Sequence, residues 1–117
     1  MRLKLKKPLV FFDLETTGTN PSYDRIIEFG GLKLFPTGNE ERKVLLINPE
    51  RPIPPEVVKI HGITDDDVAE APSFRSVAPE LLRFLSGCDL AGFGIQQFDL
   101  PLLIAEFQRA DIGFSTN

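Results

Sequence analysis

Residues 10–18 read Val10-Phe11-Phe12-Asp13-Leu14-Glu15-Thr16-Thr17-Gly18, an apolar run that leads directly into two acids. The unbroken run Leu9–Phe12 predicts a strand that is buried on both faces in the middle of a sheet. Asp13 and Glu15 stand two apart, so on a strand both side chains leave the same face, with Cα atoms about 6–7 Å apart. Two carboxylates this close are costly unless a positive group lies between them. Because no His or Cys is near in sequence, the oxygen ligands favour a hard cation such as Mg²⁺ or Mn²⁺.

Two other interpretations of this motif stay open at this point. Asp-x-Asp at a strand end is also the signature of phosphatases in which the first Asp attacks and the second is the acid. Glu15 in the second place departs from that pattern. A merely solvated strand end is the other interpretation, and it explains poorly why two acids follow three apolar residues.

The rest of the chain predicts one α/β domain over residues 1–117, with a mixed sheet flanked by helices and no repeat or linker. Gly30-Gly31 lies inside a strand pattern, which predicts a bulge or a close backbone approach. The expected elements after the first strand are strand Arg25–Phe35, turn Pro36–Asn39, strand Lys43–Ile47, helix Glu56–His61 ending at Gly62, a helix capped by Ser73 and stopped by Gly87, strand Asp89–Phe93 and helix Gln97–Ala110. Pro79 predicts either a kink in the helix after Ser73 or a later start of its regular part.

Composition and charge narrow the class of function. The net charge of −4 argues against wrapping a long duplex, although it allows a grip on the last nucleotides of a strand. Cys88 is the only cysteine, so no internal disulfide can form and a reducing cytoplasm is the expected compartment. The longest apolar runs are far too short to span a membrane.

A third acid, Asp99, lies in the stretch Gly92–Leu103, in the first turn of the last expected helix. The helix dipole favours an anion there, so an ordinary helix-start Asp is one interpretation. The other is a further metal ligand, since Phe98 beside it offers a ring on which a base could stack next to a metal.

These residues carry a family resemblance. The stretch Val10–Gly18 resembles the first motif of the DnaQ-like, or DEDDh, 3′→5′ exonucleases. Ile60-His61-Gly62-Ile63-Thr64 resembles the loop that this family places beside the terminal nucleotide, and Gly92–Leu103 resembles its second motif. The three motifs stand in the family's order and cover nearly the whole chain.

The resemblance implies an RNase H-like fold and hydrolysis of a single-stranded 3′ end with two Mg²⁺ or Mn²⁺ ions. Asp13, Glu15 and Asp99 would be the catalytic residues and metal ligands. Leu14, Thr16, Thr17 and Gly18 would line the terminal nucleotide through backbone groups. His61, Ile63 and Phe98 would flank its base or sugar.

Two departures from the family pattern affect these expectations. Phe93-Gly94 replaces the usual polar His/Tyr-Asn pair, and the third motif, a His a few residues before a last Asp, is absent. His61 is the only histidine and matches the loop motif, where a structural hydrogen bond is as plausible as substrate contact. We therefore expect a C-terminally incomplete domain with weak activity, since losing a general base costs roughly 10²–10⁴-fold. A non-catalytic binding module on the same fold is the alternative, and a homodimer or a partner segment could complete the site.

Overall fold

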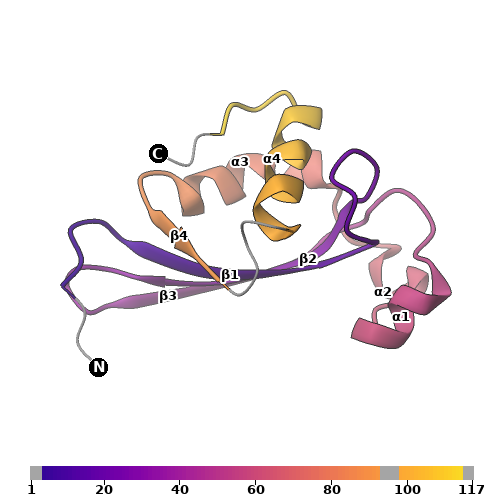
Figure 1. Ribbon diagram of the computed structural model, residues 1–117, viewed down its shortest axis with the longest axis horizontal. Helices are drawn as coiled ribbons and strands as arrows, with labels where there is room; N and C mark the ends of the chain where they lie inside the picture. Colours follow the sequence, from indigo (N-terminus) through magenta and orange to yellow (C-terminus); the bar gives the residue numbers. More distant parts are fainter. Residues whose placement is uncertain (1–3, 93–97, 115–117) are drawn as a thin grey trace.

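The computed structural model describes residues 4–92 and 98–114. Its sheet has the strand order β3-β2-β1-β4. The hairpins β1–β2 and β2–β3 are antiparallel, whereas β1 and β4 are parallel, so the prediction of a mixed sheet is confirmed. The strands are β1 Leu9–Thr16, β2 Ile26–Leu34, β3 Glu40–Leu46 and β4 Asp89–Ala91 (Figure 1).

The two longer helices lie together over one face of this sheet, and the two short ones lie beside the end at which β1 stops (Figure 1). The longer helices contribute Leu81 and Phe107 to the main core, where they pack with Phe12 and Phe29 of the sheet. The helices are α1 Pro55–His61, α2 Asp65–Val68, α3 Phe74–Leu85 and α4 Leu100–Arg109.

Strand β1 is buried on one face only, so the prediction of burial on both faces is wrong. Val10, Phe12 and Leu14 are buried under the helices, whereas Phe11 is 40% exposed and Asp13 is also exposed. The reason is that α3 and α4 cover a single face of the sheet. The other face, which we call the open face, carries the side chains that alternate with the core.

Local sequence signals set most element boundaries as expected. The Ser73 side chain accepts a hydrogen bond from the Ser76 N–H at the start of α3, and Gly62 ends α1 with a left-handed φ of 77°. The short helix α2 was not predicted, although Thr64 and Asp67 form a reciprocal capping box at its start. Strand β3 begins three residues earlier than expected. The predicted ends at Phe93 and Gln97 lie outside the described residues.

Gly31 shows why the strand pattern contains a glycine pair. A Cβ at Gly31 would lie 2.8 Å from a ring carbon of Phe29 and 3.0 Å from one of Phe84, so the rings need the space. The expected close approach is therefore present, while the register runs through Gly30 and Gly31 without a shift. The bulge lies instead at the end of β1, between Glu15 and Thr16.

Candidate functional site

The carboxylates of Asp13 and Asp99 meet because β4 is short. Its last residue, Ala91, pairs with Phe11, so no strand among the described residues pairs with β1 from Phe12 onward on that edge. Asp99 stands at the N-terminal cap of α4 and makes no side-chain cap hydrogen bond. Its carboxyl group instead reaches the edge of β1, where it lies next to the backbone of Leu14 and the side chain of Asp13.

The electrostatics of this cluster favour a bound cation. Burial raises the pKa of Asp99 to about 6, the negative charge of Asp13 adds to this rise, and the Leu14 backbone hydrogen bond opposes it. Asp99 Oδ2 is buried, and no described residue hydrogen-bonds to it. Burial likewise raises the pKa of Glu15, a rise that Asp13 adds to and His61 opposes. A buried, unpaired carboxylate oxygen beside a second carboxylate is what a cation would stabilise.

The structure brings these carboxylates together as pairs. Asp13 interacts with Asp99 on one side and with Glu15 on the other. Within residues 4–92 and 98–114, no three Asp, Glu, His or Cys side chains converge closely enough to hold one ion. Glu28 adds a carboxylate that the sequence did not single out, because it pairs with Glu15 across β1 and β2. The donor set, oxygen atoms only, suits a hard divalent ion.

The loop that follows β1 is held by a buried aspartate, Asp24. The Thr17 hydroxyl is buried, donates to Asp24 Oδ1 over 2.9 Å and accepts from the Arg25 N–H over 3.0 Å. Gly18 lies against the same carboxylate, since a Cβ there would be 2.5 Å from Asp24 Oδ2. Sequence reasoning missed Asp24, and the Asx-like spacing to Asn20, whose N–H donates to Asp24 Oδ2, was its only signal.

The residues expected to line a nucleotide differ in what they present. The side chain of Leu14 lies in the core, and the Thr17 hydroxyl is fully engaged, so both have only backbone atoms to offer. The Thr16 hydroxyl donates to the Gly18 carbonyl oxygen. Phe98, directly before Asp99, is about half exposed.

His61 has one structural hydrogen bond and one unused nitrogen. Its Nδ1 accepts the Ile63 N–H over 3.0 Å, which leaves Nε2 as the protonated nitrogen of the neutral ring. Nε2 is buried and has no hydrogen-bond partner among the described residues. The ring also lies near the carboxyl group of Glu15. Ile63 packs on a small apolar cluster of Ile27, Ile53 and Val68.

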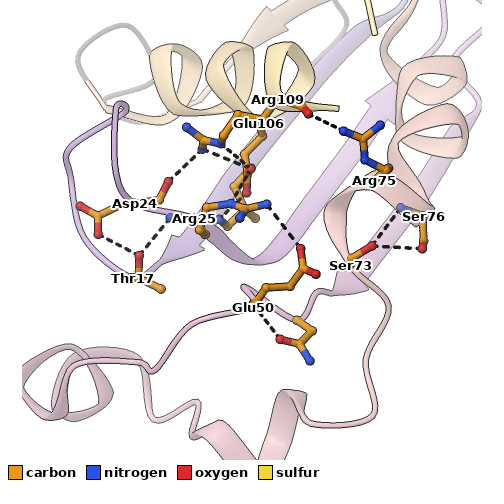
Figure 2. A network of polar contacts seen from close by, with 11 residues as sticks. Thr17, Asp24, Arg25, Glu50, Ser73, Arg75, Ser76, Glu106 and Arg109 are labelled. Carbon is orange, nitrogen blue, oxygen red and sulfur yellow. Dashed lines mark hydrogen bonds and ion pairs between the residues drawn. The ribbon is translucent and has the colours of Figure 1, made fainter. Parts of the chain in front are cut away.

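Helix α4 is tied to the loop and to β2 by a buried charge network (Figure 2). The carboxylate of Glu106 accepts hydrogen bonds from Arg25 Nε over 2.8 Å and from the Ile26 N–H over 2.9 Å. Arg109 donates to Glu106 and to the carbonyl oxygens of Pro21 and Asp24. The network therefore joins the helix that begins at Asp99 to the loop that follows Glu15. The sequence analysis singled out neither Glu106 nor Arg109.

Comparison with known proteins agrees with this fold. Residues 10–112 match the family described as exonuclease, and the chain therefore belongs to the DnaQ-like exonucleases of RNase H-like fold. It is 34% identical over 116 residues to DNA polymerase III subunit epsilon of Haemophilus influenzae, covering 92% of this chain and 44% of that protein. It is 41% identical over 95 residues to the epsilon subunit of Treponema pallidum, covering 81% of this chain and 44% of that protein.

Solved structures show the same fold. Exonuclease I of E. coli in complex with a dT13 oligonucleotide superimposes with a TM-score of 0.80 at 23% identity, over 92% of this chain and 25% of that one. Exonuclease I of Methylocaldum szegediense gives a TM-score of 0.79 at 27% identity, over 88% of this chain and 24% of that one. The chain thus spans less than half the length of these relatives. No helix among the described residues is long and apolar enough to cross a membrane.

Proposed function

We propose that this chain carries the greater part of the active site of a 3′→5′ exonuclease acting on single-stranded nucleic acid. The observation that carries the proposal is the approach of Asp99 to Asp13 at the free edge of β1, with one carboxylate oxygen left unpaired. Membership of the exonuclease family supports a nuclease of this type. The direction of digestion and the use of metal are parts of the proposal.

Asp13, Glu15 and Asp99 would hold two divalent cations, Mg²⁺ or Mn²⁺. When bound, such ions supply water activation and charge stabilisation at the leaving oxygen. The contribution of the chain is to hold the three carboxylates in place before the ions arrive, since β1 fixes Asp13 and Glu15 and the Glu106 network fixes α4. Preorganised ligands of this kind avoid reorganisation during the reaction.

The terminal nucleotide would lie against the end of β1. Backbone groups of Leu14 and of residues Thr16, Thr17 and Gly18 would contact its sugar, because the side chains there are buried or engaged. Phe98 offers an exposed ring for a base or sugar, and Ile63 an apolar flank. His61 would flank the nucleotide with its ring, since Nδ1 accepts the Ile63 N–H and Nε2 is buried.

A binding module without catalysis is the second candidate. The only histidine in the sequence, His61, accepts the Ile63 N–H through Nδ1 in its neutral form, so it is poorly placed to act as a general base. The 117-residue chain is therefore expected to hydrolyse weakly. A partner segment or a second copy that covers the open face would complete it, and light scattering over a range of protein concentrations tests the second copy.

The test is digestion of a single strand labelled at its 5′ end, in DNA and RNA forms, with Mg²⁺, with Mn²⁺ and with EDTA. Digestion from the 3′ end produces a ladder of labelled products that shorten with time. Digestion from the 5′ end releases a labelled mononucleotide at once and would refute the proposed direction. A phosphorothioate at the 3′-terminal linkage should delay the ladder.

The variant Asp13→Asn should reduce the rate by at least about 100-fold, because it removes a ligand shared by the carboxylate pairs. The matched control is Asp89→Asn, since Asp89 lies on the same sheet at the far end of β1 and is exposed. Binding with no metal-dependent hydrolysis would favour the second candidate. Equal activity of the two variants would place the catalytic centre elsewhere.

A further inference from the structure

Tyr23 and Arg51 form a stacked pair between two segments that are distant in sequence. The guanidinium carbon of Arg51 lies 4.2 Å from the centroid of the Tyr23 ring. Tyr23 is nevertheless 63% exposed. Because the guanidinium covers one face of the ring, this exposure belongs to the opposite face and the ring edge.

The charge of Arg51 is not neutralised within the described part of the chain. No described carboxylate lies within ion-pair distance of its guanidinium, since the neighbouring Glu50 turns towards Arg25 at 3.9 Å. Its Nε is buried and has no hydrogen-bond partner among the same residues. In a chain with a net charge of −4, this is an unpaired cation beside an open aromatic face.

The pair lies at the end of the sheet at which β1 stops, the end that carries Glu15. Tyr23 is in the loop that joins β1 to β2 and begins after Thr16. Arg51 is in the segment that follows β3, and the last residue of β3, Leu46, pairs with Glu28. Glu28 in turn pairs with Glu15, so both segments leave the sheet beside the carboxylates.

The backbone around Tyr23 is held in place before any ligand arrives. The adjacent Asp24 binds the Thr17 hydroxyl and the Asn20 N–H, and the Tyr23 N–H donates to the Asn20 carbonyl oxygen. Arg109 holds the carbonyl oxygens of Pro21 and Asp24 on either side of it. With its backbone held and one ring face against Arg51, Tyr23 loses less entropy on binding, which favours its use as a contact surface.

We propose that Tyr23 and Arg51 bind a nucleotide upstream of the terminal one. A base stacks on the open face of Tyr23, and the Arg51 guanidinium binds a backbone phosphate. The upstream position follows because the terminal nucleotide has its own set of contacts at the end of β1. This inference rests on the proposed function and extends it, from a site for one terminal nucleotide to a path for a single strand.

The experiment measures binding of fluorescent oligothymidylates by anisotropy, in an Asp13→Asn background that suppresses cleavage. We compare a labelled mononucleotide, which has no upstream nucleotide, with an oligomer of about eight nucleotides, a length within the usual range of single-strand sites. Tyr23→Ala should weaken binding of the oligomer about tenfold, as loss of one stacked base does. It should leave mononucleotide binding unchanged, and Tyr23→Phe should restore binding of the oligomer.

Arg51 gives a second, independent readout. Arg51→Ala should reduce the slope of log K against log salt concentration by about 0.7, the value for one phosphate contact on a single strand. Arg51→Lys should keep the slope, because it keeps the charge. Since Tyr23 is exposed, its variants should fold, and thermal denaturation followed by far-UV circular dichroism checks this.

The outcomes separate this inference from the proposed function. If the background protein binds the oligomer and both Tyr23→Ala and Arg51→Ala leave that binding unchanged, the upstream contact is refuted while the exonuclease proposal stands. Equal weakening of mononucleotide and oligomer binding by Tyr23→Ala would move the ring to the terminal nucleotide and also refute the upstream position. Absence of binding to either ligand would overturn both proposals.

Discussion

Replacement of Glu106 tests the claim that buried charges hold α4 against the loop and β2. Glu106 is 1% exposed and accepts hydrogen bonds from Arg25, from the Ile26 N–H and from Arg109. Glu106→Ala leaves a buried N–H unpaired and two guanidinium groups without their shared anion. Removing one partner from such a buried set costs about 3–5 kcal/mol of the free energy of unfolding.

The assay is urea denaturation followed by far-UV circular dichroism, which suits a chain without tryptophan. A loss of this size lowers the melting temperature on the order of 10–20 °C for a domain this small. Glu106→Gln should cost less than Glu106→Ala, because its amide oxygen can still accept from the Ile26 N–H. The slope of the free energy against urea must stay constant for the comparison to hold.

Glu80→Ala is the matched control. Glu80 is also a helical glutamate in an ion pair, with Lys43 Nζ at 2.6 Å, but its side chain is 46% exposed. We expect this control to shift the urea midpoint far less than Glu106→Ala does. Similar shifts in both variants would refute the reasoning that burial and shared donors make Glu106 important.

Three further predictions concern the loop and the carboxylate site. Gly18→Ala should lower the free energy of unfolding by about 1–3 kcal/mol, because its Cβ would meet Asp24 Oδ2 at 2.5 Å. The control Gly30→Ala has open space around its Cβ and should fold with nearly unchanged stability in the same urea assay. Thr17→Val should lose about 1–3 kcal/mol, since Asp24 and the buried loop lose the hydroxyl that bridges them, and calorimetric melting measures this. In EDTA, burial raises the pKa of Asp99 from 3.8 in the unfolded chain to about 6 in the folded protein. The protonated carboxyl group therefore favours the folded state. The contribution of this protonation to the free energy of unfolding is fully present below pH 3.8 and is lost as the pH rises through 6. The wild type should therefore lose stability relative to Asp99→Asn between these two pH values. A flat difference between the two melting curves across this range would contradict the burial of Asp99.

Local patterns in the chain were enough to place most of the elements. The apolar run before Asp13, the turn after Phe35, the cap at Ser73 and the left-handed Gly62 are signals that act over a few residues, so they can be read without knowing the fold. The pairing of Asp13 with Glu15 on one face of a strand follows from the strand period alone. The capping box of Thr64 and Asp67 is equally local, and it was present to be recognised.

Long-range contacts account for what could not be predicted. Burial of β1 on one face depends on where α3 and α4 pack, and the meeting of Asp99 with Asp13 depends on β4 ending at Ala91. Glu106 looks like a surface charge on its helix until Arg25, which is 81 residues earlier in the chain, comes within 2.8 Å of it. Residue type and spacing thus specified the carboxylate motif. Which oxygen atoms are buried, shared or unpaired depends on groups that only the folded chain brings together, and desolvation by those groups sets their pKa values.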